Sequence, residues 1–332
     1  MQQLIMAILL ALIVTLALGP LIIPMLRRLN VGQPMRSDGP KSHLSKEGTP
    51  TMGGIIILFG ILAGTLSFSM AGMEFVLPAL LTTFAFGLVG FLDDFIKVKL
   101  KRSLGLKAYQ KIIGQLGIAF IVALYAYKDP YVGSSIYFPF FGAEWNLGVA
   151  YIPFIMFVII GTVNAVNLTD GLDGLASGVT MIYSLAMALI FMLNSVYAKE
   201  NGQIYYSVNL EGMSVFAAAA VGASLGFLRY NAHPARVFMG DTGSLALGGA
   251  VAMMAIFSRA VFLLPMMGIC FVASAISVIL QVGSYKLRKK RIFKMAPLHH
   301  HFELKGVPET KVVAVYMIVT AAACLVGLLA YV

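Results

Sequence analysis

The polar side chains able to do chemistry in this sequence are concentrated in four short motifs. The first is 91–97, FLDDFIK, in which Asp93 and Asp94 are adjacent and Lys97 follows Asp93 by four residues. Two neighbouring carboxylates at a hydrocarbon boundary repel each other and lose solvation, so a cation must compensate them. Lys97 could be that cation in a plain ion pair. Alternatively, the carboxylates form a magnesium or phosphate site, because hard oxygen ligands suit that metal.

The second motif, 164–176, reads NAVNLTDGLDGLA. Asn167, Asp170 and Asp173 recur every three residues, which predicts that they lie on one side of a helical turn. The glycine after each aspartate lets a ligand approach the backbone closely. We expect Asp170, or the threonine before it, to cap the following helix, whose exposed amide groups then face the same pocket.

The third motif, 229–244, reads RYNAHPARVFMGDTGS. Pro234 ends a helix, and the glycines on either side of Asp241 predict a tight turn that opens the next apolar segment. Asp241 could simply cap that segment. If the apolar segments around these motifs cross a membrane, the carboxylates of the first two motifs lie on the same side of it as Asp241. A third acidic site there favours a metal and phosphate centre instead.

The fourth motif, 296–303, reads APLHHHFE and follows a basic run. Three consecutive histidines cannot all face one metal ion from a regular helix, so a zinc site is not expected here. Imidazoles that contact phosphate, or that orient a carboxylate, fit the motif better.

The segments between these motifs are strongly apolar. Hydrophobic residues make up 59% of the 332 residues and charged residues 11%, against about 25% in an ordinary soluble domain. A helix needs about 17 to 25 apolar residues to cross hydrocarbon. The sequence therefore predicts an all-α integral membrane protein, a single polytopic domain over 1–332. Its ten expected transmembrane helices are 1–26, 48–73, 75–92, 112–127, 145–169, 174–198, 212–228, 242–258, 260–285 and 312–332.

The basic residues predict the orientation, because Lys and Arg accumulate on the cytosolic side. The connections after the first, third, fifth, seventh and ninth segments, counted with helix ends, hold 21 of the 24 Lys and Arg residues. Lys128, Lys199 and Arg259 lie elsewhere. The same connections carry the four motifs, so we expect cytosolic active-site loops. An even number of spans places both termini on the extracytoplasmic side.

The formal net charge of +10 has two interpretations. The basic loops could lie against anionic headgroups, with 286–294 as the densest patch. They could also surround a cytosolic pocket and attract a polyanionic substrate. We expect no nucleic acid partner, because no soluble basic domain exists to carry one. On the other side, the aromatic-rich loop 129–145, which ends at Trp145, predicts a short outer β-hairpin that rests at the headgroup level.

At these motifs the chain resembles the phospho-N-acetylmuramoyl-pentapeptide transferases, members of the polyprenyl-phosphate N-acetylhexosamine-1-phosphate transferase superfamily. The resemblance covers the whole chain, including ten spans with both termini outside. The aspartate pair recurs across the superfamily, whereas PLHHHFE is typical of the muramoyl-pentapeptide branch. The matching stretches are GTPTMGG at 48–54, the pair Asp93 and Asp94, NLTDGLDGL at 167–175, FMGDTGS at 238–244, and PLHHHFE at 297–303.

The resemblance implies attack of undecaprenyl phosphate on UDP-N-acetylmuramoyl-pentapeptide, which yields lipid I and UMP. It implies a magnesium cofactor held by Asp241, a multi-pass protein of the bacterial cytoplasmic membrane with a cytosolic active site, and a homodimer. Lys97 and Lys111 resemble phosphate-contacting lysines, and Phe238 resembles a stacking partner for uracil. The implied catalytic residues are Asp93, Asp94, Asp241, His299 and His300. The implied substrate contacts are Lys46, Lys97, Lys111, Asn167, Asp170, Gly171, Leu172, Asp173, Asn231, Phe238, Gly240, Gln281, Ala296 and His301.

Two alternatives stay open at this point. A sister transferase would use UDP-N-acetylglucosamine as its donor, although the histidine run argues against it. An ion-coupled transporter would place ionisable residues near the bilayer midplane and show inverted repeats, neither of which is visible in the sequence. One-step attack and a two-step route through a covalent aspartyl intermediate would use the same residues.

Overall fold

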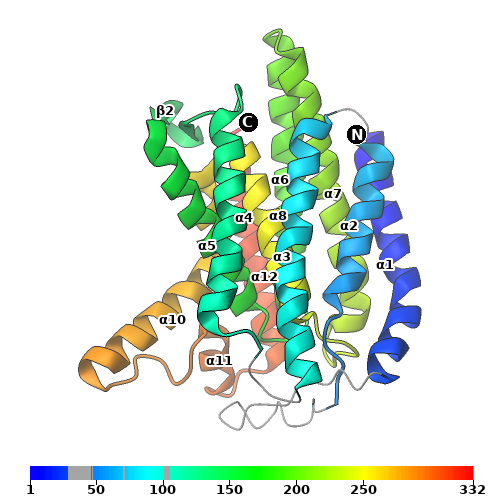
Figure 1. Ribbon diagram of the computed structural model, residues 1–332, viewed down its shortest axis with the longest axis vertical. Helices are drawn as coiled ribbons and strands as arrows, with labels where there is room; N and C mark the ends of the chain where they lie inside the picture. Colours follow the sequence, from blue (N-terminus) through cyan, green and yellow to red (C-terminus); the bar gives the residue numbers. More distant parts are fainter. Residues whose placement is uncertain (29–45, 47, 70–71, 101–104, 332) are drawn as a thin grey trace.

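The computed structural model describes residues 1–28, 46, 48–69, 72–100 and 105–331. These residues form a bundle of helices with one small sheet (Figure 1). The helices are α1 (Gln2–Arg28), α2 (Gly54–Phe68), α3 (Met73–Lys99), α4 (Ala108–Lys128), α5 (Tyr151–Thr169), α6 (Leu175–Glu200), α7 (Ile204–Asn231), α8 (Gly240–Phe257), α9 (Leu264–Met267), α10 (Ile269–Arg288), α11 (Leu298–Glu303) and α12 (Glu309–Leu328). The strands are β1 (Ser135–Phe138) and β2 (Ala143–Asn146).

The long helices run side by side, and both termini lie at the end of the bundle that carries the hairpin (Figure 1). α7 and α8 form the centre, since nearly all side chains of α8 and most of α7 are buried. α6 and α1 pack along α7, while α3 and α5 pack along α8. The four motifs lie at the opposite end from the hairpin, where the connections after α3, α5, α7 and α10 meet.

Nine helices in the described part of the chain are long and apolar enough to cross a membrane. This confirms a helical protein with many potential spans. The tenth apolar helix, α2, has 15 residues, which at 1.5 Å per residue gives about 22 Å against ~30 Å of hydrocarbon. The number of ten spans therefore stays a prediction. Four basic residues used to assign orientation, Arg36, Lys41, Lys101 and Arg102, lie outside the described residues.

α2 is shorter than the predicted segment 48–73 because the chain before it pairs with the third motif. The Phe238 N–H donates to the Pro50 carbonyl at 2.8 Å, and the Gly53 N–H donates to the Phe238 carbonyl at 2.9 Å. The Gly54 N–H then donates to the Met239 carbonyl at 2.9 Å. These bonds take up backbone groups that a longer helix would use, and they fix the position of the 238–244 motif.

Glycines bring α3 and α5 close to α8, as small residues do between membrane helices. A Cβ added at Gly90 of α3 would collide with the backbone carbonyl of Asp241 at the start of α8. A Cβ added at Gly248 of α8 would lie 2.6 Å from the Cα of Val163 in α5. Since Gly90 lies one turn before Asp93, this close approach puts the first and third motifs in contact.

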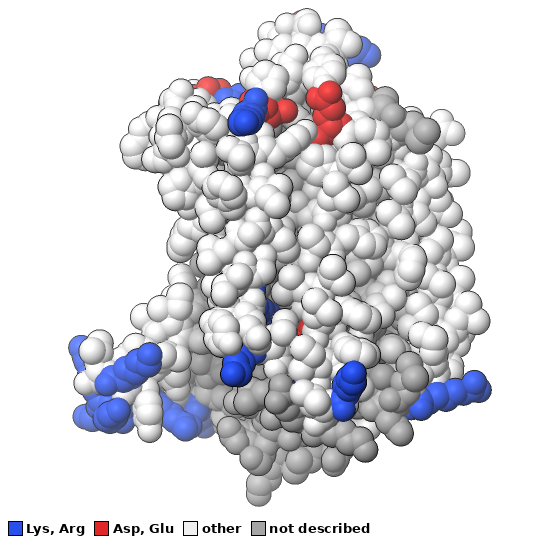
Figure 2. Space-filling view, viewed as in Figure 1, with Lys and Arg blue, Asp and Glu red and all other residues white. Residues whose placement is uncertain are grey.

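The predicted segment 260–285 is divided in the structure. The four-residue α9 ends at Met267, and α10 starts at Ile269 after Gly268. Figure 1 shows α10 leaving the bundle at a steep angle at the lower left. It exposes large apolar side chains, among them Ile279 and Leu287. Figure 2 shows Lys and Arg side chains gathered around this lower end and at the tip of α10, whereas the upper end carries both signs of charge.

The predicted hairpin is confirmed. β1 and β2 pair antiparallel, with Ile136 opposite Trp145. Its contacts tie it to the end of α8, because the Tyr137 N–H donates to the Arg259 carbonyl at 3.1 Å. The Arg259 guanidinium also lies 3.1 Å from the Glu144 carboxylate. Trp145 itself stays 62% exposed.

Candidate active site

Three aspartates from two helices form a compact acidic centre. Asp93 and Asp94 lie near the end of α3 and are 3% and 1% exposed, and Asp241 lies in the first turn of α8. One carboxylate oxygen from each lies within 4.8 Å of the others, which is close enough to hold a metal ion. The first and third motifs, 144 residues apart where Lys97 contacts Asp241, therefore form one centre.

Two lysines balance most of this negative charge. Lys97 Nζ lies 2.6 Å from Asp93 Oδ2 and 3.0 Å from Asp241 Oδ2. Lys111, in the first turn of α4, places its Nζ 2.9 Å from the same Asp241 oxygen. The ion pair between Lys97 and Asp93 is thus present, as one of the two interpretations of that motif predicted. Three carboxylates against two ammonium groups still leave one net negative charge when all five are ionised.

The protein holds two of the carboxylates in fixed orientations. Asp94 Oδ2 accepts hydrogen bonds from the backbone N–H and the hydroxyl of Thr242, at 2.9 and 2.8 Å. Asp93 Oδ1 accepts the Leu106 N–H at 2.8 Å. Asp94 Oδ1, in contrast, is buried and accepts no hydrogen bond from the described residues, while the Lys97 ammonium lies 3.7 Å from it. An oxygen in that condition, among other hard oxygens, suits a metal ligand.

The second motif contributes the next part of the site. Asn167, in the last turn of α5, donates from Nδ2 to Asp241 Oδ1 and to the Ser244 hydroxyl, both at 2.8 Å. Asp170 follows the end of α5 and lines a cavity beside Asp241. Burial, together with the carboxylates of Asp241, Asp94 and Asp173, raises the pKa of Asp170 to about 8.

The expected cap of the following helix is wrong. α6 begins at Leu175, and its N-cap is Gly174, which has a φ of 80° and provides no side-chain cap. The turn 170–174 stands between the two helices, so neither Asp170 nor Thr169 is placed to cap α6. Thr169 instead donates its hydroxyl to the Ala165 carbonyl within α5, at 2.8 Å.

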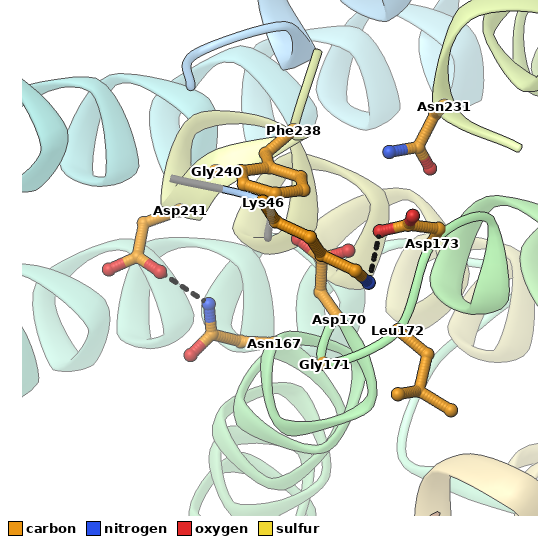
Figure 3. A pocket seen from close by; sticks show the side chains of 10 residues that line it. All are labelled: Lys46, Asn167, Asp170, Gly171, Leu172, Asp173, Asn231, Phe238, Gly240 and Asp241. Carbon is orange, nitrogen blue, oxygen red and sulfur yellow. Dashed lines mark hydrogen bonds and ion pairs between the residues drawn. The ribbon is translucent and has the colours of Figure 1, made fainter. Parts of the chain in front are cut away.

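A cavity of about 200 Å³ opens beside Asp241. Figure 3 shows the Lys46 side chain reaching across it towards Asp173, with the Phe238 ring beside Lys46 and Asn167 pointing at Asp241. The cavity thus has a carboxylate and lysine centre at one side and an aromatic ring on its wall. Its lining residues are Lys46, Asn167, Asp170, Gly171, Leu172, Asp173, Asn231, Phe238, Gly240 and Asp241.

The histidine motif borders this cavity from behind the turn 170–174. α11 carries His299 and His300, both buried. A Cβ added at Gly171 would collide with His299 Nε2 and would lie 3.0 Å from His300 Nε2. His300 Nδ1 lies 2.7 Å from Glu303 Oε2, so a carboxylate orients this imidazole.

Three predicted residues belong neither to the cavity lining, nor to the acidic centre with its two lysines, nor to the buried histidine pair. Gln281 of α10 accepts the backbone N–H groups of Ile292 and Phe293 and stabilises the turn after α10. His301 Nδ1 accepts the Lys294 N–H at 3.0 Å, and His301 is absent from the cavity lining. Ala296 lies in the loop before α11 and is likewise absent from the lining.

Two residues that sequence reasoning missed are part of the site. Glu309, at the start of α12, accepts the Lys46 ammonium at 2.7 Å and the Asp173 N–H at 2.7 Å. His233 Nδ1 lies 3.1 Å from Asp173 Oδ2. His233 lies inside the third motif, so its neighbourhood had been recognised but its contact had not. Glu309 lies beyond the histidine motif and had no local signal except its place before an apolar segment.

Known proteins provide an independent comparison. The family described as Glycosyl transferase family 4 matches residues 76–259, and the Phospho-N-acetylmuramoyl-pentapeptide-transferase signature 1 matches residues 46–58. A phospho-N-acetylmuramoyl-pentapeptide-transferase of Alkaliphilus metalliredigens is 51% identical over 99% of this chain and 98% of its own length. Those of Thermoanaerobacter pseudethanolicus and Clostridioides difficile are 50% and 48% identical, over 97% of this chain and 97% and 96% of their own lengths.

The family match covers more than half of the chain, and its range includes the first three motifs. The relatives are similar over almost their whole length, including the part that carries the histidine motif. The chain therefore belongs to glycosyl transferase family 4 and, within it, to the phospho-N-acetylmuramoyl-pentapeptide-transferases.

Proposed function

We propose that this protein transfers phospho-N-acetylmuramoyl-pentapeptide from UDP-N-acetylmuramoyl-pentapeptide to undecaprenyl phosphate. A phosphate oxygen of the lipid attacks the β-phosphorus of the donor, and the bond from that phosphorus to the bridging oxygen breaks. UMP leaves with the bridging oxygen, and the lipid product is lipid I. The observation that carries this proposal is the contact of Asp241 with Lys97, Lys111 and Asn167 at the edge of the cavity that Phe238 also lines.

The cavity fits the uridine part of the donor, with its diphosphate directed at the acidic centre. The Phe238 ring offers a flat apolar face for a base, and the turn 170–174 offers backbone groups without obstructing side chains at its glycines. Lys97 and Lys111 supply positive charge where the β-phosphate would lie, so they neutralise charge and align the leaving group.

Magnesium fits the donor set of Asp93, Asp94 and Asp241, which consists only of carboxylate oxygens. The buried Asp94 Oδ1, which accepts no hydrogen bond from the described residues, supports this assignment. We assign Asp241 as the principal ligand, because it lies between the aspartate pair and the cavity. When bound, Mg²⁺ supplies charge neutralisation on the diphosphate.

The remaining chemistry falls to the protein's own groups. Asp93 is oriented by the Lys97 ammonium and by the Leu106 N–H, and we assign it the role of a base or a nucleophile in this centre. We assign to His300, which Glu303 orients, a contact with a phosphate of the donor. We further propose a homodimer with ten spans in the bacterial cytoplasmic membrane, with this site on the cytosolic face.

The test is UMP release by the purified protein in detergent with undecaprenyl phosphate and Mg²⁺. We expect release with UDP-N-acetylmuramoyl-pentapeptide, no release with UDP-N-acetylglucosamine, and loss of release on chelation. Release with the glucosamine donor alone would assign the chain to the sister reaction. Undiminished release in the presence of a chelator would remove the metal from the proposal.

A further inference from the structure

A second cluster of charged groups lies on the far wall of the cavity from the acidic centre. Glu309 is the first residue of α12 and is mostly buried. Its Oε1 accepts the Lys46 ammonium at 2.7 Å and the backbone N–H of Asp173 at 2.7 Å. One carboxylate oxygen therefore holds two parts of the cavity wall, one from the segment before α2 and one from the turn after α5.

The other contacts of this cluster close a ring. Lys46 Nζ also lies 2.8 Å from Asp173 Oδ1. Asp173 Oδ2 accepts the Ala235 N–H at 3.1 Å and lies 3.1 Å from His233 Nδ1. That imidazole nitrogen lies 3.3 Å from Glu309 Oε2. Four segments of the chain thus meet at the Asp173 and Glu309 carboxylates.

The charge arrangement makes Glu309 hard to replace. The Asp173 side chain is 2% exposed, that of Glu309 9% and that of Lys46 12%, so the three charges are largely removed from water. Removing one charge of such a buried group leaves the remaining charges uncompensated. The resulting loss of folding free energy is larger than the contribution of an ion pair at the surface. Without Glu309, the Lys46 ammonium would keep only Asp173, and the Asp173 N–H would lose its acceptor.

We propose that Glu309 is a positioning residue for the donor nucleotide. It fixes Lys46 and the turn 170–174 in the geometry that the uridine part requires, and it does not contact the reacting phosphates. This inference rests on the proposed function and deepens it. It separates the cavity into a chemical side, built on Asp241, and a binding side, built on Glu309, which lies in a helix that contributes nothing to the acidic centre.

The main experiment compares Glu309→Gln with the wild type in steady-state kinetics. The amide keeps the shape but loses the charge, so we expect the KM for the donor to rise about 10- to 100-fold, the range of a lost hydrogen bond to a charged group. We expect kcat to change less than about threefold, because the acidic centre is untouched. Glu74→Gln, in the first turn of α3 at the hairpin end, is the matched control and should leave both constants unchanged.

A thermal unfolding scan is run on each variant, because replacing a residue that only stabilises the fold would lower the unfolding temperature. A lower unfolding temperature with an unchanged KM would overturn the proposal and show that Glu309 only stabilises the fold at the start of α12. A fall in kcat with an unchanged KM would overturn it as well, since that result would place Glu309 in the chemistry.

A double-mutant cycle tests whether Glu309 acts through Lys46. Lys46→Met alone should raise the KM, and adding Glu309→Gln should raise it by much less than the product of the two single effects, because the groups share one interaction. Effects that simply multiply would show that the two residues act independently, and would overturn the proposed route.

Binding of UDP, measured by calorimetry without acceptor lipid, separates this inference from the proposed function. If the wild type binds UDP but shows no transfer, the proposed function fails, and weaker UDP binding by Glu309→Gln would still support the positioning role. If both proteins bind UDP equally well, the positioning role fails whatever the activity. If the wild type does not bind UDP, both fail.

Discussion

Asp241 has more contacts with neighbouring polar side chains than either aspartate of α3. Its two oxygens receive Lys97, Lys111 and Asn167 at distances between 2.8 and 3.0 Å. Asp241→Asn removes the charge but keeps a side chain of the same size, and Lys97 retains Asp93 as a partner. We expect the variant to fold, with UMP release reduced about 100- to 1,000-fold, as for loss of one group that stabilises a transition state. Release at the wild-type rate would contradict the metal assignment.

Asp170 makes the free energy of unfolding depend on pH, and the direction of that dependence follows from the surroundings of its carboxyl group. Its pKa is raised to about 8 by burial and by neighbouring carboxylates, whereas an unfolded chain loses this proton near pH 4. Between about pH 4 and pH 8 the folded state therefore binds more protons than the unfolded state, so rising pH lowers the free energy of unfolding.

Asp170→Asn removes that titration. We expect the difference in unfolding temperature, Asp170→Asn minus wild type, to be larger at pH 8 than at pH 5 when measured in detergent without divalent cations. Glu200→Gln, at the exposed end of α6, provides the control and should follow the wild type at both pH values. A constant difference between Asp170→Asn and the wild type would contradict the raised pKa.

At the scale of elements, the site depends on how closely the turn 170–174 lies against α11. Gly171→Ala would push a methyl group into the His299 ring and towards that of His300. Because small displacements of positioning groups are costly, we expect kcat/KM to fall about 10- to 100-fold. Gly161→Ala in α5 meets no atom within 4 Å and should leave kcat/KM unchanged. Equal activity of both variants would show that the histidines do not need this contact.

Hydropathy located the elements but not all of their ends. It could not predict that α2 begins only at Gly54. The residues before Gly54 form hydrogen bonds with Phe238 and Met239, which lie far along the chain. The division at Gly268 was missed for a related reason, since an apolar run has the same composition whether it is one helix or two. The hairpin was predictable, because dense aromatics and glycines mark strands and turns locally.

The same distinction applies to the candidate site. Asp93, Asp94 and Lys97 are neighbours in sequence, so their ion pairing could be read from spacing alone. Glu309 is 136 residues from Asp173, and only the folded chain brings them together. Gln281 was assigned to the site by resemblance; its side chain accepts the Ile292 N–H of the turn after α10, and its contact with substrate stays a prediction. Local motifs thus identified the chemical side of the cavity, while much of its binding side needed the tertiary structure.

At the scale of the whole molecule, the orientation of the bundle can be measured with cysteine labels. Cys270 and Cys324 are the chain's two cysteines, and both are buried. Glu144→Cys places a thiol on the exposed hairpin, and Lys290→Cys places one after α10. In intact cells an impermeant maleimide should label Glu144→Cys, and label Lys290→Cys only after permeabilisation. The reverse pattern would invert the proposed orientation.

The hairpin also determines what optical spectroscopy of this protein can detect. Trp145 on β2 is the chain's single tryptophan and is 62% exposed, at the end of the bundle opposite the acidic centre. Intrinsic tryptophan fluorescence therefore reports the surroundings of the hairpin and is insensitive to nucleotide entering the cavity. A blue shift on transfer from detergent to lipid vesicles would mean that the indole has moved among headgroups. A ligand titration, in contrast, needs a second fluorophore placed near Phe238.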